Sequence, residues 1–498
     1  MTPRTDKVAV DAFTQILNLF KPGTIRYSRQ VFCNRNLRMS KTQAVGFDMD
    51  YTIAVYTQEF DHLAFDLALQ RLVDSFGFPP TVKQFTFDND FAIRGLVIDM
   101  VNGNLFKMDR HRHVSRVTHG TRLIDIEKRN ETYRQKVIHL SRPSYFLIDT
   151  LFALPEANTF AQMVDFLDSV GKGTPKNYET AFQSIRNAID QIHRDNSLKS
   201  VVMSNPERYI KKDPDIILTF ENFLANNKKL FLVTNSGWEY TNSILSYLLN
   251  GLSETYPHWS DFFEVIVVDA QKPLFFSGRN PMVPESDAPE EIRHKVFRKG
   301  NLKALQKILG TPGERTLYVG DHIYGDILRS KRSSTWRTCM IIPEMEPELE
   351  ALEAVREDMN KYYRLFRRRE SLEIQLNYQQ RLLTSLLNFD DLSKSPSLSP
   401  PERVRALAAL AERNVAELRK ELRRAEDAIH ATDNIIRKAT NERWGWLFKE
   451  GTIHSVFGEQ VEQYACTYTS RVSNFLSYSP SHYFRAAQDR LPHEQGLT

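Results

Sequence analysis

The sequence lacks three features that would place it in a specialised class of protein. It has only three cysteines, Cys33, Cys339 and Cys466, and they are widely spaced. This odd number excludes a complete disulfide framework, and the spacing is not that of a zinc site, so we expect free thiols in a reducing compartment. No apolar run approaches the roughly 18 residues of a membrane-spanning helix, and no secretory signal opens the chain. We therefore expect a soluble cytoplasmic protein that does not enter a membrane.

The chain also lacks a strong excess of either charge. Its 66 lysines and arginines and 62 aspartates and glutamates leave a net charge of +4. A nucleic-acid partner usually requires a pronounced positive excess, so we expect none. With 41% hydrophobic and 26% charged residues, the composition is that of an ordinary folded protein. A chain of 498 residues is long enough for two or three structural units.

Four apolar runs end in polar side chains, and we predict that these runs are parallel strands of one open sheet. Ligands of such sheets bind at the edge formed by the carboxyl ends of the strands. The polar side chains that follow the runs should therefore meet at one site. They are Asp48 and Asp50, then Thr234, Asn235 and Ser236, then Lys272, and finally Asp321 and Asp326.

The aspartate pair after the first run is the most informative part of this pattern. Side chains alternate along a strand, so Asp48 and Asp50 project to one side while Met49 returns to the core. Two carboxylates so close repel each other unless a cation lies between them. Alone, the pair could also cap a following helix. Together with the other three runs, it predicts a Mg²⁺ site in which one aspartate attacks phosphorus and the other transfers a proton.

The order and chemistry of these residues resemble those of the haloacid dehalogenase superfamily of phosphohydrolases. Longer stretches, namely FDMDYTIAVY, VTNS, VDAQKPLFF and YVGDHIYGDILRSK, are similar to the cytosolic purine 5′-nucleotidases that prefer IMP and GMP. The similarity runs from about Asn34 to Glu494, except between roughly 345 and 440. It implies an α/β fold with a Rossmann-like parallel sheet and an inserted cap domain. It also implies hydrolysis of purine nucleoside monophosphates, accompanied by phosphate transfer to nucleosides.

The resemblance implies a role for each residue of the predicted site. Asp48 would be the nucleophile that forms an aspartyl phosphate, and Asp50 would act as general acid and base. Mg²⁺ would be held by Asp48, by the backbone carbonyl of Asp50 and by Asp321. Asp326 would orient Lys272 or a metal-bound water rather than bind the metal directly. The residues expected near the phosphate group of the substrate are Thr234, Asn235, Ser236, Lys272 and Lys199.

A helix predicted over residues 182–193 carries the candidate base-recognition residues. Arg186, Asp190 and His193 share one face because they are spaced four and three residues apart. The alternative interpretation is an exposed Arg–Asp ion pair beside a solvated histidine. The resemblance assigns this face to the purine, and an acceptor carboxylate suits the N1–H that IMP and GMP have and AMP lacks. It also matches Phe152 to an aromatic that stacks on the base, although this residue could equally be an ordinary core phenylalanine.

The spacing of the motifs predicts how the chain is divided. The interval between Asp50 and Thr234 is much longer than one crossover helix requires, so it must contain an inserted unit. Residues 84–119 of this insertion, with Asn102-Gly103-Asn104 as a turn, are typical of short strands in a hairpin. The predicted units are 1–60 (lead-in and first core strand), 61–225 (insertion with the cap), 226–345 (remaining core), 346–440 (helical hairpin) and 441–498 (helical segment packing on the core).

The divergent stretch is predicted to be an antiparallel helical hairpin. Its two helical parts, 346–388 and 402–440, are separated by the linker Ser393–Pro401, and apolar residues recur in the second part in steps of three and four. Because short connections make adjacent helices pair, we expect the hairpin to pack within its own chain, with pairing to a neighbouring chain as the alternative. By resemblance we expect a dimer or tetramer. A further helix is expected around Val10–Phe20.

Two other functions stay open from the sequence. The same chemistry could act on another phosphomonoester, such as a sugar phosphate. A catalytically idle phosphatase fold could instead serve as an interaction protein that binds a partner through the hairpin. The presence of every motif residue favours an enzyme, because a scaffold has no need for Asp48, Asp50, Lys272 and Asp321 together.

Overall fold

The chain consists of two compact units. The first comprises Met1–Pro347 and Leu447–Thr498, and the second comprises Glu348–Trp446. The predicted helix Val10–Phe20 and, apart from Pro401, the predicted linker Ser393–Pro401 lie outside the described residues. The residues that the computed structural model describes are 25–328, 334–388 and 401–487.

The first unit is built around a nine-stranded sheet with the order β1-β19-β16-β15-β3-β11-β12-β14-β13. All neighbouring strands from β19 to β14 pair in parallel, and the two edge strands are antiparallel. The central strands are almost uninterrupted apolar runs, as expected of strands that are buried on both faces. The bounds are β1 (Phe32–Cys33), β3 (Ala44–Phe47), β11 (Lys229–Val233), β12 (Val265–Val268), β13 (Met282–Pro284), β14 (Val296–Lys299), β15 (Thr316–Gly320), β16 (Arg337–Ile341) and β19 (Thr467–Thr469).

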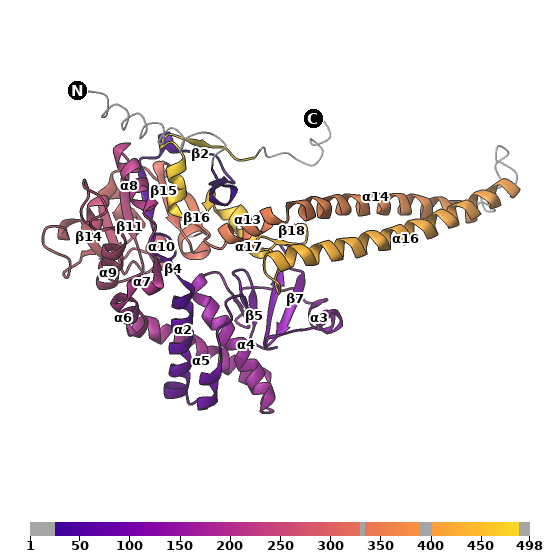
Figure 1. Ribbon diagram of the computed structural model, residues 1–498, viewed down its shortest axis with the longest axis horizontal. Coiled ribbons are helices and arrows are strands. Elements are labelled where there is room, and N and C mark those ends of the chain that lie inside the picture. The colour runs from indigo at the N-terminus through magenta and orange to yellow at the C-terminus, as the bar shows by residue number, and fades with distance from the viewer. Residues whose placement is uncertain (1–24, 329–333, 389–400, 488–498) are drawn as a thin grey trace, which may run out of the picture. The chain divides into compact units, whose positions relative to one another are not determined.

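Helices pack beside this sheet (Figure 1). Their apolar faces join the strands in two buried clusters, one of which contains Phe231, Tyr318 and Trp336. The predicted α/β fold class with a parallel sheet is confirmed. The helices of this part are α8 (Asp215–Ala225), α9 (Trp238–Leu249), α10 (Leu274–Ser277), α11 (Leu302–Leu309) and α17 (Val456–Tyr464).

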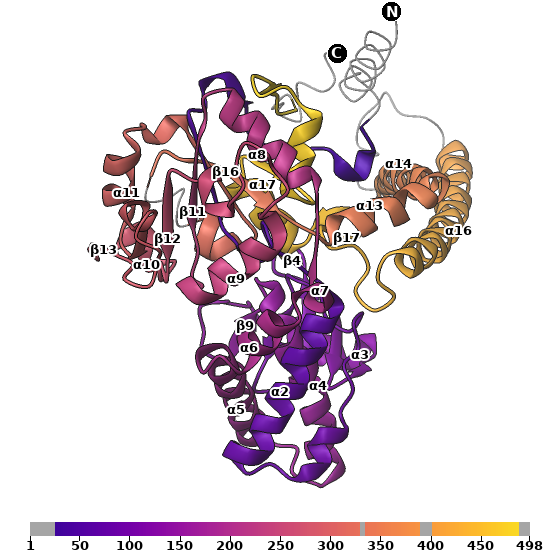
Figure 2. The ribbon, with the colours of Figure 1, turned by 60° about the vertical axis from the view of Figure 1, so that its left-hand side comes forward.

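The insertion between β3 and β11 contains both helices and a second sheet. Its helices α2, α4 and α5 lie side by side (Figures 1 and 2). Its five-stranded antiparallel sheet has the order β8-β7-β6-β5-β9, and Gly103 turns the predicted β5–β6 hairpin with a φ of +64°. The bounds are α2 (Gln58–Phe76), β5 (Val97–Asp99), β6 (Asn104–Met108), β7 (Val114–His119), β8 (Arg122–Leu123), α3 (Ile126–Tyr133), β9 (Tyr145–Leu147), α4 (Leu154–Ser169), α5 (Pro175–Arg194), α6 (Ser197–Ser204) and α7 (Pro206–Tyr209).

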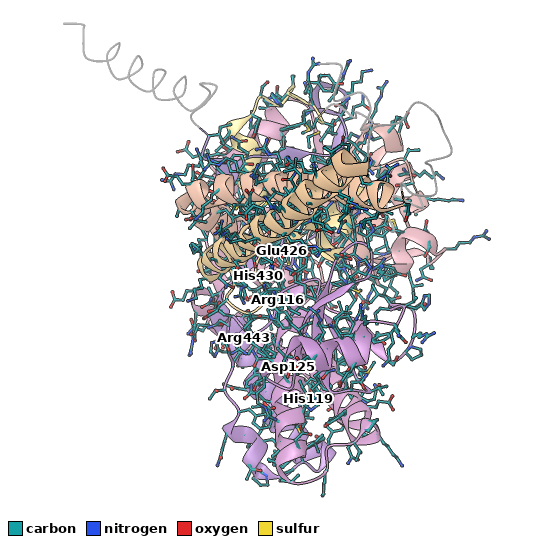
Figure 3. All side chains as sticks on the ribbon, turned by 90° about the vertical axis from the view of Figure 1, so that its right-hand side faces the viewer. Arg116, His119, Asp125, Glu426, His430 and Arg443 are labelled. Atoms are coloured by element: carbon teal, nitrogen blue, oxygen red, sulfur yellow. The ribbon has the colours of Figure 1, made fainter. Side chains whose placement is uncertain are left out.

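Polar contacts tie this second sheet to the helices beside it. His119 on β7, labelled in Figure 3, places one ring nitrogen 2.8 Å from the side-chain oxygen of Asn104 and the other 3.0 Å from Asp168 on α4. The hydroxyl of Tyr178 on α5 donates to the same aspartate. Helix α5, which carries Arg186, Asp190 and His193, is therefore held with α4 to a common scaffold.

The second unit contains the predicted helical hairpin. Helices α14 (Arg356–Leu387) and α16 (Pro401–Ala439) pack along each other (Figure 1), and α13 (Met345–Ala354) leads into them. Tyr362 of α14 forms a buried cluster with Ile429 and Ile436 of α16. The predicted helical hairpin is present, and its two helices contact each other within the chain.

The prediction of a helical segment over residues 441–498 is wrong for most of the described part. One α-helix, α17, and a short 3₁₀ helix (Val472–Ser477) lie there, but residues Thr467–Thr469 form β19, which pairs with β16 in the main sheet. The β-branched threonines suit a strand, and a neighbouring parallel strand supplies the hydrogen bonds that decide the conformation. The remaining short strands are β2 (Leu37–Arg38), β4 (Val55–Tyr56), β10 (Ile210–Lys211), β17 (Lys449–Glu450), β18 (Ile453–His454) and β20 (Tyr483–Phe484).

Within the described residues, no helix combines the length and the apolar character that crossing a membrane requires.

Candidate active site

The carboxyl ends of four adjacent parallel strands bring the predicted catalytic residues together. Asp48 directly follows β3, Thr234 follows β11, and Asp321 follows β15. Lys272 lies four residues beyond the end of β12, and Asp326 lies in the turn after β15. Because these strands are neighbours and point the same way, residues that are up to 278 positions apart (48 to 326) meet at one edge of the sheet.

Lys272 is the buried cation of this edge. Its side chain is 4% exposed, and its Nζ lies 2.8 Å from Asp48 Oδ2 and 2.7 Å from Asp326 Oδ1. It also donates to the Tyr318 hydroxyl at 3.3 Å. Burial disfavours the ammonium form, but the carboxylates of Asp326 and Asp48 outweigh it and hold the pKa of Lys272 well above its ordinary value. The lysine therefore stays charged at any physiological pH.

Asp326 reaches Lys272 because a glycine leaves room for it. A Cβ atom at Gly320 would lie 2.7 Å from the Asp326 side chain, closer than real contacts allow. One oxygen of Asp326 accepts from Lys272, and the other accepts from the backbone N–H of His322 at 3.3 Å. Both oxygens thus have partners, which suits a residue that orients the lysine.

Three buried carboxyl groups at this edge could hold a metal ion. Asp48, Asp321 and Asp326 each offer an oxygen within 4.8 Å of the others. The Oδ2 atom of Asp321 is buried without a hydrogen-bond partner among the described residues. Burial raises the pKa of Asp48 to about 8 against the opposing effect of Lys272, and burial with Asp326 and Asp48 raises that of Asp321 well above its ordinary value. A single lysine faces these three carboxyl groups, and their hard oxygen donors fit Mg²⁺.

Arg94 supports this cluster, and sequence reasoning missed it. The residue is 1% exposed, its guanidinium donates two hydrogen bonds of 2.7 and 2.6 Å to Glu344, and Nη1 donates to the backbone carbonyl of Asp321 at 2.8 Å. An arginine so deeply buried requires such a bidentate partner. Its partners lie 250 and 227 positions away in the chain, so no local pattern could have indicated them.

Asp50 accepts hydrogen bonds from hydroxyl groups and does not take part in the contacts of Lys272. Its Oδ1 accepts from the Tyr56 hydroxyl at 2.6 Å, and its Oδ2 accepts from Ser236 Oγ at 2.9 Å. The Tyr56 hydroxyl lies 2.9 Å from that of Tyr240. The two tyrosines were not predicted from the sequence, although Tyr56 lies only six positions after Asp50.

The residues after β11 are hydrogen-bonded to the loop that carries Lys272. Asn235 Oδ1 accepts from the backbone N–H of Lys272 at 2.6 Å, and Asn235 Nδ2 donates to its carbonyl at 3.1 Å. Thr234 is fully buried, and its hydroxyl accepts from Ser236 N–H at 3.0 Å. Helix α9 has Gly237 as its N-cap, so Thr234 does not cap this helix.

A cavity of about 650 Å³ opens beside these strand ends. Asp48, Thr234, Lys272, Asp321 and Asp326 are buried and do not line it. Aromatic side chains and a few charged groups form its wall, as in many sites for small molecules. The predicted residues that line the cavity are Asp50, Phe152, Arg186, Asp190, His193, Lys199, Asn235 and Ser236.

The face of α5 that was assigned to the base lines this cavity. Among the described side chains, Arg186 pairs with Glu156 of α4, at 3.5 Å, rather than with Asp190, and its guanidinium lies 4.4 Å from the centre of the Phe146 ring. The alternative of an exposed Arg186–Asp190 pair is therefore wrong. His193 is half-buried rather than solvated, and burial together with Lys199 lowers its pKa to about 4, so its imidazole is neutral at pH 7.

Phe152 lies between the main core and the cavity. It packs edge-on against Tyr51, with ring centres 4.8 Å apart, and belongs to the border of the main core. It also lines the cavity, where His193 meets it at 5.5 Å with the two rings perpendicular. Lys199, on the same cavity, holds its Nζ 5.3 Å from the centre of the Tyr240 ring.

A parallel sheet with acidic groups and a lysine at the carboxyl ends of its strands suits a phosphomonoester hydrolase, and the sequence comparison identifies that class. The model of the 5′ nucleotidase family matches residues 31–496, and the chain belongs to this family. It is accordingly a 5′-nucleotidase hydrolase.

Several known proteins resemble the chain over nearly its whole length. A 5′-nucleotidase domain-containing protein of Dictyostelium discoideum is 27% identical over 486 residues, which are 94% of this chain and 75% of the relative. The 5′-nucleotidase domain-containing protein 2 of Rattus norvegicus and that of Homo sapiens are each 24% identical over 97% of this chain, and the match covers 82% and 87% of them. A crystal structure of a predicted phosphoglycolate phosphatase from Haemophilus somnus covers 60% of this chain and 85% of its own at 12% identity, with a TM-score of 0.26, too low to support a conclusion.

Proposed function

We propose that this protein is a Mg²⁺-dependent 5′-nucleotidase that hydrolyses the 5′-monophosphates of 6-oxopurine nucleosides, IMP and GMP and their deoxy forms, in preference to AMP. The observation that carries the proposal is the buried Lys272–Asp48 contact of 2.8 Å beside a cavity lined by Arg186, Asp190 and His193. The Lys272–Asp48 contact supports phosphoryl transfer, and the charged residues of the cavity wall support selection of a base.

Each residue of the cluster has a defined task in this mechanism. An Asp48 oxygen attacks phosphorus, the bond from phosphorus to the nucleoside O5′ breaks, and Asp50 gives its proton to that oxygen. Asp50 then takes a proton from the water that attacks the aspartyl phosphate, which releases inorganic phosphate and restores Asp48. Lys272 lies against Asp48 and would offset the charge of the phosphoryl oxygens. If a nucleoside hydroxyl attacks instead of water, the phosphate is transferred to that nucleoside.

The donor set fits Mg²⁺. Asp48, Asp321 and the backbone carbonyl of Asp50 would hold the ion, and the partnerless Oδ2 of Asp321 supports this assignment. When bound, Mg²⁺ would supply positive charge to the phosphate oxygens. Asp326 already has Lys272 and a backbone N–H as partners, so we assign it an orienting role.

Chelation provides the first test. With Mg²⁺ present, phosphate release should be led by IMP or GMP over AMP, CMP and UMP, and excess EDTA should lower the rate by about 10³-fold because buried carboxylates then repel the substrate phosphate. The melting temperature should rise when Mg²⁺ is added back, since binding to the folded state stabilises it. Equal rates with and without EDTA, or release from sugar phosphates alone, would contradict the proposal.

Base selection is tested at Asp190. In Asp190→Ala, the ratio of kcat/KM for IMP to that for AMP should fall by about tenfold or more, because a charged acceptor for N1–H is lost. Glu179→Ala is the matched control, since Glu179 is an exposed acid on the same helix and does not line the cavity. An unchanged ratio in the Asp190 variant would remove this residue from base recognition.

A further inference from the structure

Glu156 is a buried carboxyl group in the wall of the cavity, and none of the predicted roles uses it. It lies on α4, which runs beside α5 (Figure 2), and it is 3% exposed. Its Oε2 lies 3.5 Å from Arg186 Nη1. Its Oε1 is buried and has no hydrogen-bond partner among the described residues. The residue thus lines the cavity and carries one acceptor oxygen that has no partner among the described residues.

The partnerless oxygen does not stabilise the fold. An unpaired buried polar atom opposes folding, and an apolar side chain would avoid this cost. Burial raises the pKa of Glu156 to about 7, with Arg186 opposing the shift and Asp190 adding to it. Because this pKa lies above the ordinary value of 4.5, ionisation opposes folding increasingly as the pH rises from about 4.5 to 7. An acceptor that opposes folding and lies beside a binding cavity indicates a side chain that receives its hydrogen bond from a bound ligand.

Glu156, Arg186 and Asp190 form one end of the cavity wall, and their chemistry indicates which base the cavity accepts. Arg186 pairs with one oxygen of Glu156, and Asp190, which lies on the same helix face as Arg186, places a second carboxyl group near Glu156. The carboxyl oxygens of Glu156 and Asp190 are hydrogen-bond acceptors, so they suit a nucleotide base whose edge offers two N–H donors. Guanine offers N1–H and an adjacent 2-amino group, hypoxanthine offers N1–H alone, and adenine has an acceptor at N1.

Resting on the proposed function, we infer that Glu156 is a specificity-determining residue that acts together with Asp190. The two carboxylates accept hydrogen bonds from the 2-amino group and N1–H of guanine, so the protein prefers GMP to IMP. Arg186 pairs with Oε2 of Glu156 and leaves Oε1 without a protein partner among the described residues. Hypoxanthine leaves that oxygen unpaired, and this is the physical basis of the discrimination.

The test compares wild type and Glu156→Gln on GMP, IMP and AMP. Wild type should prefer GMP to IMP by about tenfold in kcat/KM, and the variant should lose most of this preference, mainly through a higher KM for GMP. Glu285→Gln is the matched control, because Glu285 is equally buried and does not line the cavity. Melting temperatures at pH 5 and pH 8 show whether the variant folds, and Glu156→Gln should gain more stability at pH 8 than at pH 5.

The outcomes separate this inference from the function on which it rests. A GMP-to-IMP ratio that is the same in wild type and Glu156→Gln overturns the inference alone, as does a wild type that hydrolyses both at equal rates. A purely structural role would lower the melting temperature and affect both nucleotides equally, which also overturns it. A wild type that hydrolyses para-nitrophenyl phosphate, which has no base, but no nucleotide overturns the proposed function and the inference together.

Discussion

Asp48→Asn should lower kcat for GMP by about 10⁴-fold or more, because an amide cannot form the aspartyl phosphate. The substitution is nearly isosteric and removes one carboxylate from a buried group whose members repel each other. Burial already raises the pKa of Asp48 to about 8, and Lys272 keeps Asp326 as a carboxylate partner at 2.7 Å, so the melting temperature should fall little. The measurement is phosphate release together with acid-quench trapping of radiolabelled phosphoenzyme, which should be absent from the variant.

The control for this variant is Asp66→Asn. Asp66 is an exposed aspartate on α2 that is outside the cavity wall, and its replacement should change kcat by less than about threefold. If Asp48→Asn kept activity within tenfold of wild type, or still formed a labelled enzyme, the nucleophile would be another residue and the mechanism would have to be abandoned.

Lys272→Met should damage both catalysis and stability. The lysine is the cation between Asp48 and Asp326, at 2.8 and 2.7 Å, and its loss leaves buried carboxylates without a partner. Removing one member of a buried ion pair typically lowers the free energy of unfolding by about 3–5 kcal/mol. Loss of the charge beside the transferring phosphate should lower kcat by about 10²–10³-fold. Urea denaturation and steady-state kinetics measure the two effects separately.

Lys228→Met is the control that separates the loss of stability from the loss of catalysis. Lys228 is also buried, but its Nζ donates to the backbone carbonyls of Met39 and Thr42, at 2.6 and 2.9 Å, and not to a carboxylate. Its replacement should lower stability and leave kcat of the folded protein within about threefold of wild type. If the two lysine variants lost kcat equally, the catalytic role assigned to Lys272 would be wrong.

The sequence was sufficient for the local part of the site. An apolar run followed by Asp48 and Asp50 specifies a buried strand and the direction of two carboxylates, because alternation along a strand is a property of the backbone. The same reasoning located the ends of β11, β12 and β15, which the sheet order then makes neighbours of β3. Spacing along α5 likewise placed Arg186, Asp190 and His193 on one face, and all three line the cavity.

Sequence reasoning failed where a conformation or contact depends on distant parts of the chain. Strand β19 was expected to be part of a helical segment, and its pairing with β16 decided otherwise. Arg94 was missed because its partners are more than 200 positions away. Glu156 was missed because a glutamate at that point of a helix is ordinary, and only its burial makes it unusual.

By itself, the sequence determined the elements, the kinds of reactive group and the order in which the strands deliver them, because these follow from periodicities of the backbone over a few residues. Only the tertiary structure decided which of these groups are buried, which share a cation, and that Arg186 pairs with Glu156 instead of Asp190. Desolvation and Coulomb interactions depend on distances through space and on the surrounding medium, and neither quantity is encoded in local spacing.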